Sequence, residues 1–344
     1  MGIRHLSLVV LCALGLLAAC ATGAPTSAEP AREVLRLGYF PNVTHAPAIY
    51  GVEENLFAAA LGSDVDLQLH TFNSGSEAIQ ALFSEALDAT YIGPNPAINA
   101  HAQSGGEAIR IVAGATSGGA KLVVREGILS PADLAGSRLA SPSLGNTQDV
   151  ALRAWLSEQG LAANLQGGGD VSVTPQDNAQ TLESFRARQI DGAWMPEPWA
   201  TRLEREGGGH VLVDERSLWP DGKFATTHLV VATSFLEQHE EVVRRLLEGH
   251  IAAVDAVNAD PRRAQEVVNS GIEAAAGKGL APETIAGAWE SITFTIDPIA
   301  ASLRKSAEDA TKVGLLDPVD LEGIYRVDLL NELLRQRGRE EVSD

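Results

Sequence analysis

The chain has 344 residues but only two cysteines, Cys12 and Cys20, and both lie close to its first residue. The remainder therefore offers no thiol for a disulfide, for a nucleophile or for a cysteine-ligated metal. The HExxH pattern of zinc proteases and the GxSxG elbow of hydrolases are absent as well. These absences argue against the common metalloenzymes and hydrolases, and we expect neither a metal nor a cofactor.

Positive charge is scarce too. The sequence contains 26 Lys and Arg residues against 45 Asp and Glu residues, which gives a net charge of −19. This sign is wrong for nucleic-acid binding, so we expect no nucleic-acid partner. An acidic balance of this kind is typical of a soluble surface. The length is sufficient for about two domains.

The first apolar run, "LSLVVLCALGLLAA", is too short for a comfortable membrane span of about 20 residues. It follows the basic Arg4 and ends in "LAAC", which resembles a bacterial lipobox. The resemblance implies a lipoprotein signal peptide over residues 1–20 and acylation, for example by palmitate, at Cys20. A plain secretory signal cleaved elsewhere is the alternative. Residues 21–33 are small and polar, as in a flexible tether, so we expect an extracytoplasmic, lipid-anchored protein.

From residue 34 onward, predicted strands alternate with predicted helices. This rhythm favours an α/β fold with a largely parallel sheet and helices on both faces. Beyond the strand predicted near Leu229, the pattern is almost entirely helical. The segments 86–96 and 189–198 also resemble each other: an Asp, small residues, an aromatic residue and a Pro-bracketed polar residue. This echo suggests two similar lobes that face a shared cleft, with chance similarity as the alternative.

Two turns have the composition of anion sites. Ser74 and Ser76 stand immediately before one predicted helix, and Asn146 and Thr147 before another. A helix N-terminus offers unpaired N–H donors and about half a positive charge, so it binds an anion without a lysine. Ordinary helix capping explains either turn taken alone, but one such turn in each half points to a binding site.

Two polar residues are bracketed by prolines, Asn95 in "PNP" and Glu197 in "PEP". Proline fixes φ and restricts the residue before it, so these side chains are held stiffly. Trp194 and Trp199 flank Glu197 and could form the wall of an apolar pocket. The alternative is a rigid exit from the sheet, with both polar side chains capping local backbone.

A flexible, hydrogen-bonding segment joins the two halves in "GATSGGAKLVV", residues 114–124. Its Thr, Ser and Gly residues have the properties that a hinge or a cleft wall needs.

Several phrases together resemble the solute-binding proteins of ABC importers for aliphatic sulfonates, whose neighbours bind taurine, nitrate and thiamine-precursor pyrimidines. They include "LGYFPNVTHAPAIYGVEENLF", "FNSGSEAIQALFSEALDATYIGPNPAINAH", "GNTQDVALRAWL" and "GAWMPEPWATRL". The resemblance extends over residues 34–333 and implies a two-lobed type II periplasmic-binding-protein fold with an interlobe ligand cleft. The implied segments are lobe one (34–117 and 228–344, the second part mostly helical) and lobe two (118–227), with hinges near residues 117 and 227.

The resemblance also implies which residues face the ligand: Asn42, His45, Ser74, Ser76, Asn95, Ser117, Gly118, Asn146, Thr147, Glu197 and His228. Among these, Glu197 would repel a simple anion. It either takes the ammonium group of a zwitterion such as taurine, or it pairs with a donor from lobe one and latches the closed state.

The implied function is capture of a small organic anion, an aliphatic sulfonate, without catalysis. The expected partners are the permease subunits of an ABC importer and, through Cys20, a membrane; we expect a monomer. Taurine, nitrate or a pyrimidine are alternative ligands. An enzyme of the pyrimidine-precursor synthase type is a further alternative, but those enzymes use a Cys-rich segment and this chain has no cysteine after Cys20. A sensor domain is another alternative to the binding-protein function.

Overall fold

The computed structural model describes residues 32–344. The predicted signal peptide, the acylation site at Cys20 and nearly all of the predicted tether lie outside the described residues. Within residues 32–344, no helix is long and apolar enough to cross a membrane.

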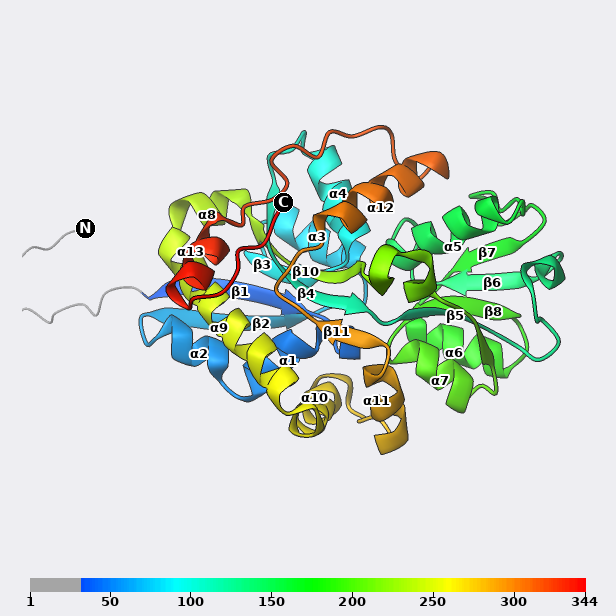
Figure 1. The fold of residues 1–344 in the computed structure, drawn as a ribbon, viewed down its shortest axis with the longest axis horizontal. Coiled ribbons are helices and arrows are strands. Elements are labelled where there is room, and N and C mark those ends of the chain that lie inside the picture. Colours follow the sequence, from blue (N-terminus) through cyan, green and yellow to red (C-terminus); the bar gives the residue numbers. More distant parts are fainter. Residues whose placement is uncertain (1–31) are drawn as a thin grey trace, which may run out of the picture. The chain divides into compact units, whose positions relative to one another are not determined.

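Two β-sheets organise the chain, with helices on both faces of each (Figure 1). The first sheet has six strands in the order β11-β4-β10-β3-β1-β2, and the second has five in the order β7-β6-β8-β5-β9. The strands of the first sheet are β1 (Glu33–Tyr39), β2 (Val65–Thr71), β3 (Ala89–Ile92), β4 (Ile109–Gly118), β10 (Ala225–Ala232) and β11 (Ile292–Phe294). Those of the second are β5 (Ala120–Val124), β6 (Arg138–Ser141), β7 (Ser172–Pro175), β8 (Gly192–Pro196) and β9 (His210–Asp214).

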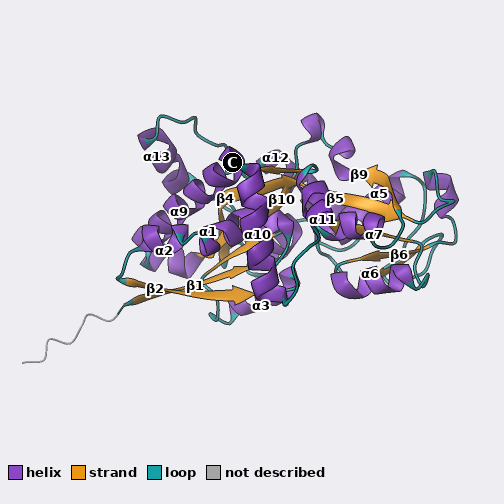
Figure 2. Ribbon diagram, turned by 90° about the horizontal axis from the view of Figure 1, so that it is seen from below, coloured by secondary structure: helices purple, strands orange, loops and turns teal. Residues whose placement is uncertain are grey.

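Helices pack on these sheets as the views from two directions show (Figures 1 and 2). The helices of the first half are α1 (Ala46–Glu53), α2 (Leu56–Leu61), α3 (Gly75–Phe83) and α4 (Pro94–Gln103). The second sheet carries α5 (Thr147–Glu158), α6 (Asn178–Arg186) and α7 (Trp199–Arg205). The later helices are α8 (Thr233–Gln238), α9 (Glu240–Ala259), α10 (Pro261–Ala276), α11 (Pro282–Trp289), α12 (Ala300–Lys312) and α13 (Asp328–Gln336). Short 3-10 turns are η1 (Val43–His45), η2 (Pro131–Leu134), η3 (Glu215–Leu218) and η4 (Pro220–Gly222).

The α/β class predicted from the sequence is confirmed, but the sheets are mixed rather than largely parallel. Strands β1, β2 and β3 are parallel, as are β6, β7 and β8. Strand β10 runs antiparallel between β3 and β4, and β5 runs antiparallel between β8 and β9. The reason is the chain path: β4 leads out of the first sheet into β5, and β10 returns from the second sheet.

Helix α10 illustrates how local sequence produces these elements. Asp260 caps its first turn by accepting a hydrogen bond from the backbone N–H of Arg263, and Pro261 occupies the first helical position, where a missing N–H costs nothing. Its buried residues, Ala264, Val267, Val268, Gly271 and Ile272, recur at helical spacing. Gly277 ends the helix in the left-handed conformation. The same periodicity lets the later helices cover the first sheet.

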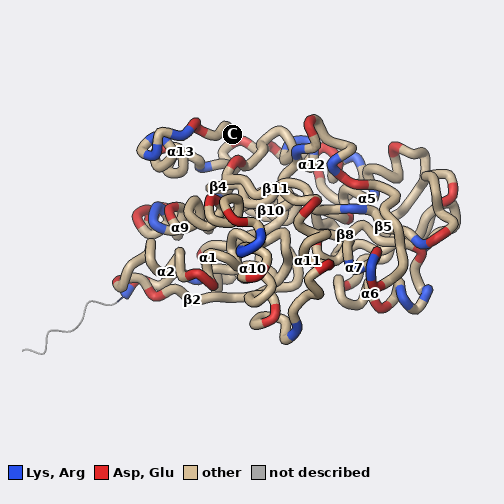
Figure 3. The backbone as a smooth tube through the Cα atoms, turned by 60° about the horizontal axis from the view of Figure 1, so that its bottom comes forward, with Lys and Arg blue, Asp and Glu red and all other residues tan. Residues whose placement is uncertain are grey.

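Charged residues lie mainly outside these sheets. Figure 3 shows acidic and basic residues interspersed along α9 and α12, whereas most of the central strands are uncharged. Strand β10 is buried along its whole length, as expected for a strand with a neighbour on each side. The net charge is therefore spread over the helical surface.

Two glycines connect the sheets. Gly118, the last residue of β4, and Gly119, which joins it to β5, have φ angles of 79° and 75°, which side-chain-bearing residues rarely adopt. A Cβ atom on Gly118 would lie 2.5 Å from the carbonyl oxygen of Ser291, and one on Gly119 would lie 2.6 Å from Cγ1 of Ile292. The segment predicted as a hinge is therefore a tight crossing. The lobe boundaries predicted at 117/118 and 227/228 stay a prediction.

Candidate functional site

A small cavity of about 40 Å³ lies where elements of both sheets meet. Strand-following segments and helix starts from the first half supply one side of it, and those of α5 and α6 supply the other. Its polar lining comprises Asn42, Thr44, His45, Asn73, Ser74, Asn146, Thr147, Gln148, Asn178, Thr226 and Thr227. Among the described residues, no Asp, Glu, Lys or Arg contributes to this lining.

Four helices begin at the cavity. Ser74 caps α3, Gly93 precedes α4, Asn146 caps α5, and Asn178 is the first residue of α6; all four line the cavity. A helix start presents unpaired N–H groups and a partial positive charge to the space beyond it, but at α4 only Asn95 has such an N–H, because Pro94 and Pro96 have none. The cavity is therefore electropositive through dipoles alone, which suits an anion.

The turn before α5 is held by a buried carboxylate. Asp149 accepts hydrogen bonds from Ser141 Oγ (2.6 Å) and Gly145 N (2.9 Å), and it pairs with Arg153 at 3.1 Å. Asn146 Oδ1 in turn caps the backbone N–H of Asp149 at 2.9 Å. Because Arg153 balances Asp149, the turn is fixed without adding net charge beside the cavity.

Thr147 is the clearest sign of a ligand contact. It is 6% exposed, and its Oγ1 has no hydrogen-bond partner within the described part of the chain. A buried hydroxyl left unpaired costs about 1–3 kcal/mol. Asn178 Oδ1 at the start of α6 is likewise unpartnered within residues 32–344. Both residues line the cavity. Thr147 Oγ1 can donate to an anion there, whereas Asn178 Oδ1 is an acceptor and needs a donor.

His45 provides a neutral donor. Its Nδ1 accepts a hydrogen bond from the backbone N–H of Phe40 at 3.3 Å, and its ring stacks on Phe40 with 4.5 Å between centroids. Burial lowers the pKa of His45 from 6.5 to about 3. The ring is therefore uncharged at neutral pH, and with Nδ1 accepting, its proton sits on Nε2.

Five of the residues expected to face the ligand line this cavity: Asn42, His45, Ser74, Asn146 and Thr147. Ser76 lies one turn away, with its Oγ 3.2 Å from that of Ser74, in a neighbouring pocket shared with Asn146. Ser117 Oγ instead accepts from Phe224 N at 3.3 Å and lies in a separate pocket beside Arg216. Gly118 belongs to the crossing described above.

Asn95, Glu197 and His228 are buried elsewhere. Asn95 is in the first turn of α4, and its Nδ2 donates to the carbonyl of Ser306 at 3.3 Å. His228 Nε2 lies 2.8 Å from the carbonyl oxygen of Pro298, and burial lowers the pKa of its ring to about 4. None of the three is among the residues of the cavity lining in the described chain.

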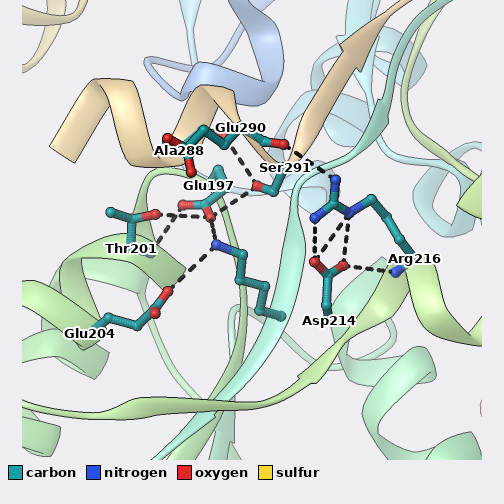
Figure 4. Close-up of polar contacts among 9 residues, drawn as sticks. Glu197, Thr201, Glu204, Asp214, Arg216, Ala288, Glu290 and Ser291 are labelled. Carbon is teal, nitrogen blue, oxygen red and sulfur yellow. Dashed lines mark hydrogen bonds and ion pairs between the residues drawn. The ribbon is translucent and has the colours of Figure 1, made fainter. Parts of the chain in front are cut away.

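Glu197 is fully buried, and both of its carboxylate oxygens are engaged by the protein (Figure 4). Lys121 Nζ lies 2.8 Å from Oε1, and Thr201 donates through its backbone N–H and its hydroxyl at 3.0 Å each. Ser291 Oγ, which precedes β11 of the first sheet, donates to Oε1 at 3.2 Å. The Glu197 carboxylate thus links the second sheet to the first.

Lys121 is held charged by this network. Burial favours the neutral amine, but the carboxylates of Glu197, Glu204 and Asp214 outweigh it and raise the pKa of Lys121. Asp214 also binds Arg216, whose Nη1 donates to the carbonyl of Glu290 at 3.3 Å (Figure 4). Beside the crossing, charged groups of the second half therefore bind neutral groups of the first half, the hydroxyl of Ser291 and the backbone carbonyl of Glu290.

Sequence reasoning missed several cavity residues: Thr44, Asn73, Gln148, Asn178, Thr226 and Thr227. A signal for Asn178 was present, because the segment before "WMPEP" echoes the segment before "YIGPNP" and so places a helix start opposite Ser74. A larger hollow of about 810 Å³ lies between α12 and the segment 318–325. It contains acidic and basic side chains and lies away from the four helix starts, so the small cavity remains the better candidate.

The fold and the cavity define the class. Two α/β halves with helix N-termini around an intervening cavity constitute the periplasmic-binding-protein fold, and solved structures agree. The alkanesulfonate-binding protein SsuA from Xanthomonas axonopodis pv. citri bound to MOPS has a TM-score of 0.70 at 19% identity, over 87% of this chain and 99% of that one. The nitrate-binding protein NrtA from Synechocystis PCC 6803 has a TM-score of 0.71 at 14% identity, over 89% of each chain.

The family follows from the sequence comparison. Residues 28–271 match the NMT1-like family, and the chain belongs to it. The taurine-binding periplasmic protein of Escherichia coli K12 is 28% identical over 215 residues, which are 62% of this chain and 64% of that protein. The match thus spans a little under two thirds of that relative. The predicted resemblance to this group of binding proteins is confirmed.

Proposed function

We propose that the protein is an extracytoplasmic solute-binding lipoprotein that captures a small organic anion, an aliphatic sulfonate, for an ABC importer. The anion lies in the small cavity, and the N-termini of α3, α5 and α6 provide its N–H donors. The observation that carries the proposal is the unpartnered Oγ1 of buried Thr147 at the start of α5, in a cavity without charged side chains among the described residues.

A singly charged sulfonate suits this cavity better than the zwitterion taurine. An ammonium group needs an acceptor of negative charge, and among the described residues no carboxylate lines the cavity. Glu197, the candidate for that role, already binds Lys121, Thr201 and Ser291. We therefore assign Glu197 to the latch between the halves rather than to the ligand.

Nitrate remains an alternative ligand because dipolar donors serve any small anion. An enzymatic role has less support. A reactive cysteine is excluded beyond Cys20 by the sequence, and His45, the histidine of the cavity, is neutral and held by Phe40. The proposed partners are the permease subunits of the importer and, through Cys20, the membrane.

Titration calorimetry with ethanesulfonate, taurine and nitrate tests the assignment. We expect ethanesulfonate to bind more tightly than taurine, and Thr147→Val to weaken its binding by about 1–3 kcal/mol, since the ligand loses a hydrogen bond in a dry site. Thr147→Ser is the matched control, because it keeps the hydroxyl and should bind nearly as wild type. If Thr147→Val lowers only stability, by about 1 kcal/mol, the residue acts as part of the helix start and not as a ligand donor.

A further inference from the structure

The small cavity is not isolated. A second cavity of about 690 Å³, here called the outer cavity, lies between α7, the end of α10 and the turn after β1. The two cavities share four wall residues, Phe40, Asn42, Asn73 and Asn178. The outer cavity therefore adjoins the small cavity.

The two cavities differ in size in a way that bears on the ligand. A buried water needs about 10–15 Å³ of such space, so the small cavity holds roughly three water-sized groups. That is enough for the three oxygens of a sulfonate head but not for an organic body. The outer cavity falls within the roughly 300–1,000 Å³ that is typical of ligand pockets.

The walls of the outer cavity favour a neutral, aromatic body. Phe40, Phe72 and Trp199 are among its lining residues. Its charged residues, Arg202, Arg205, Lys278, Asp177, Glu206 and Glu283, are three of each sign. Arg202, for example, binds Glu206 at 2.7 Å. The charges of the lining sum to zero, and the three aromatic rings provide an apolar surface for the body of a ligand.

Trp199 stands at the boundary between the cavities. Its Nε1 donates to Asn42 Oδ1 at 3.0 Å, so it reaches from α7 of the second half to a wall residue of the small cavity. Its ring, with the guanidinium of Arg202 at 4.5 Å from the ring centroid, forms part of the outer cavity. Because Asn42 lines both cavities, the indole lies next to a wall that the two cavities share.

We infer that the ligand has two parts: a sulfonate head in the small cavity and an aryl-bearing tail in the outer cavity, in contact with Trp199. The inference rests on the proposed function and narrows its ligand class from short alkanesulfonates to arylalkanesulfonates. Trp199 is then the residue that determines the preference for the tail.

The test compares ethanesulfonate with 2-phenylethanesulfonate, which differ only by the phenyl group. For the wild type we expect the phenyl compound to bind about tenfold more tightly or better, since burying a phenyl group against an aromatic wall is favourable. In Trp199→Ala the ratio of the dissociation constant of ethanesulfonate to that of 2-phenylethanesulfonate should fall toward one. A change in affinity that is common to both ligands does not alter this ratio. Trp199→Phe keeps an aromatic wall but loses the hydrogen bond to Asn42, so it should retain most of the ratio.

The outcomes separate the inference from the function on which it rests. If ethanesulfonate binds and the phenyl compound binds no better, the inference is wrong and the proposed function stands. If Trp199→Ala weakens both ligands by the same factor, Trp199 acts on closure and not on the tail, and the inference is again wrong. If neither sulfonate binds the wild type at millimolar concentration, the proposed function itself fails.

Discussion

Removing the positive charge of Lys121 provides a sharp test of the buried ion pair in the second half, whose Glu197 also contacts Ser291 of the first half. In Lys121→Met the side chain keeps its length and apolar stem but loses the ammonium group. Glu197 would then remain fully buried with only the neutral donors of Thr201 and Ser291. An unpaired carboxylate in this position is expensive, because burial removes its hydration and three neutral hydrogen bonds do not cancel its charge.

The expected loss follows from the burial of the pair. Breaking a buried ion pair by removing one partner typically costs about 3–5 kcal/mol, and Glu197 has no solvent exposure while Lys121 has 9%. With an m-value of about 3 kcal/mol per molar urea, the unfolding midpoint should fall by about 1 M or somewhat more. Urea denaturation followed by circular dichroism measures this shift, and an unchanged m-value ensures that the comparison is valid.

Two further variants complete the experiment. Lys121→Met with Glu197→Gln should recover most of the loss, because the neutral amide needs no counterion and still accepts from Thr201 N. Arg326→Met removes the cation of an exposed pair with Asp328 and should cost no more than about 1 kcal/mol. A Lys121→Met variant as stable as the Arg326→Met control, or a double variant no better than the single one, would refute the argument.

Two other predictions concern the anchor and pH. Cys20→Ser should release the protein from membranes into the soluble fraction with its fold intact, as fractionation and circular dichroism would show; membrane retention would contradict the lipobox interpretation. Burial lowers the pKa of His228 and of His250 to about 4, so both stay neutral when folded while the unfolded chain takes up protons near 6.5. The free energy of unfolding should therefore be highest above pH 6.5 and fall as the pH is lowered toward 4, by up to about 3 kcal/mol per histidine. Urea denaturation midpoints that stay constant between pH 6.5 and 4 would contradict these pKa shifts.

The sequence predicted local elements well and long-range pairing poorly. The alternation of strands and helices predicted from residue 34 onward begins with β1, Glu33–Tyr39, because alternating apolar residues and β-forming residues act locally. Strands β9 and β11 were missed, since β11 has only three residues and β9 is no more than partly buried along most of its length. The antiparallel direction of β10 depends on where the chain crosses between the two sheets. The residue pattern within β10 contains no information about that crossing, so the direction could not be predicted.

The same division applies to the site. Helix-start residues such as Ser74 and Thr147 were predictable, because a cap position fixes where a side chain lies relative to its own helix. The flanking prolines indicated that the backbone around Asn95 and Glu197 is rigid, but they did not indicate where the two side chains point. Pro94 and Pro96 occupy the first turn of α4, where proline is well tolerated, and α4 turns Asn95 toward α12. Glu197 faces Lys121 for a similar reason: the packing of β8 on β5 decides its surroundings.

The distribution of charge bears on how the proposed anion would be bound and released. The net charge of −19 gives an approaching anion no long-range attraction, so recognition depends on donors within the cavity. Had a lysine lined the small cavity, loss of the anion would leave a buried unpaired cation, at a cost of several kcal/mol. Helix N-termini impose no such penalty, because water can replace the ligand at their N–H groups. Fixed charges such as Lys121 and Glu197 are instead paired with each other away from the cavity, so their stability does not depend on a bound anion.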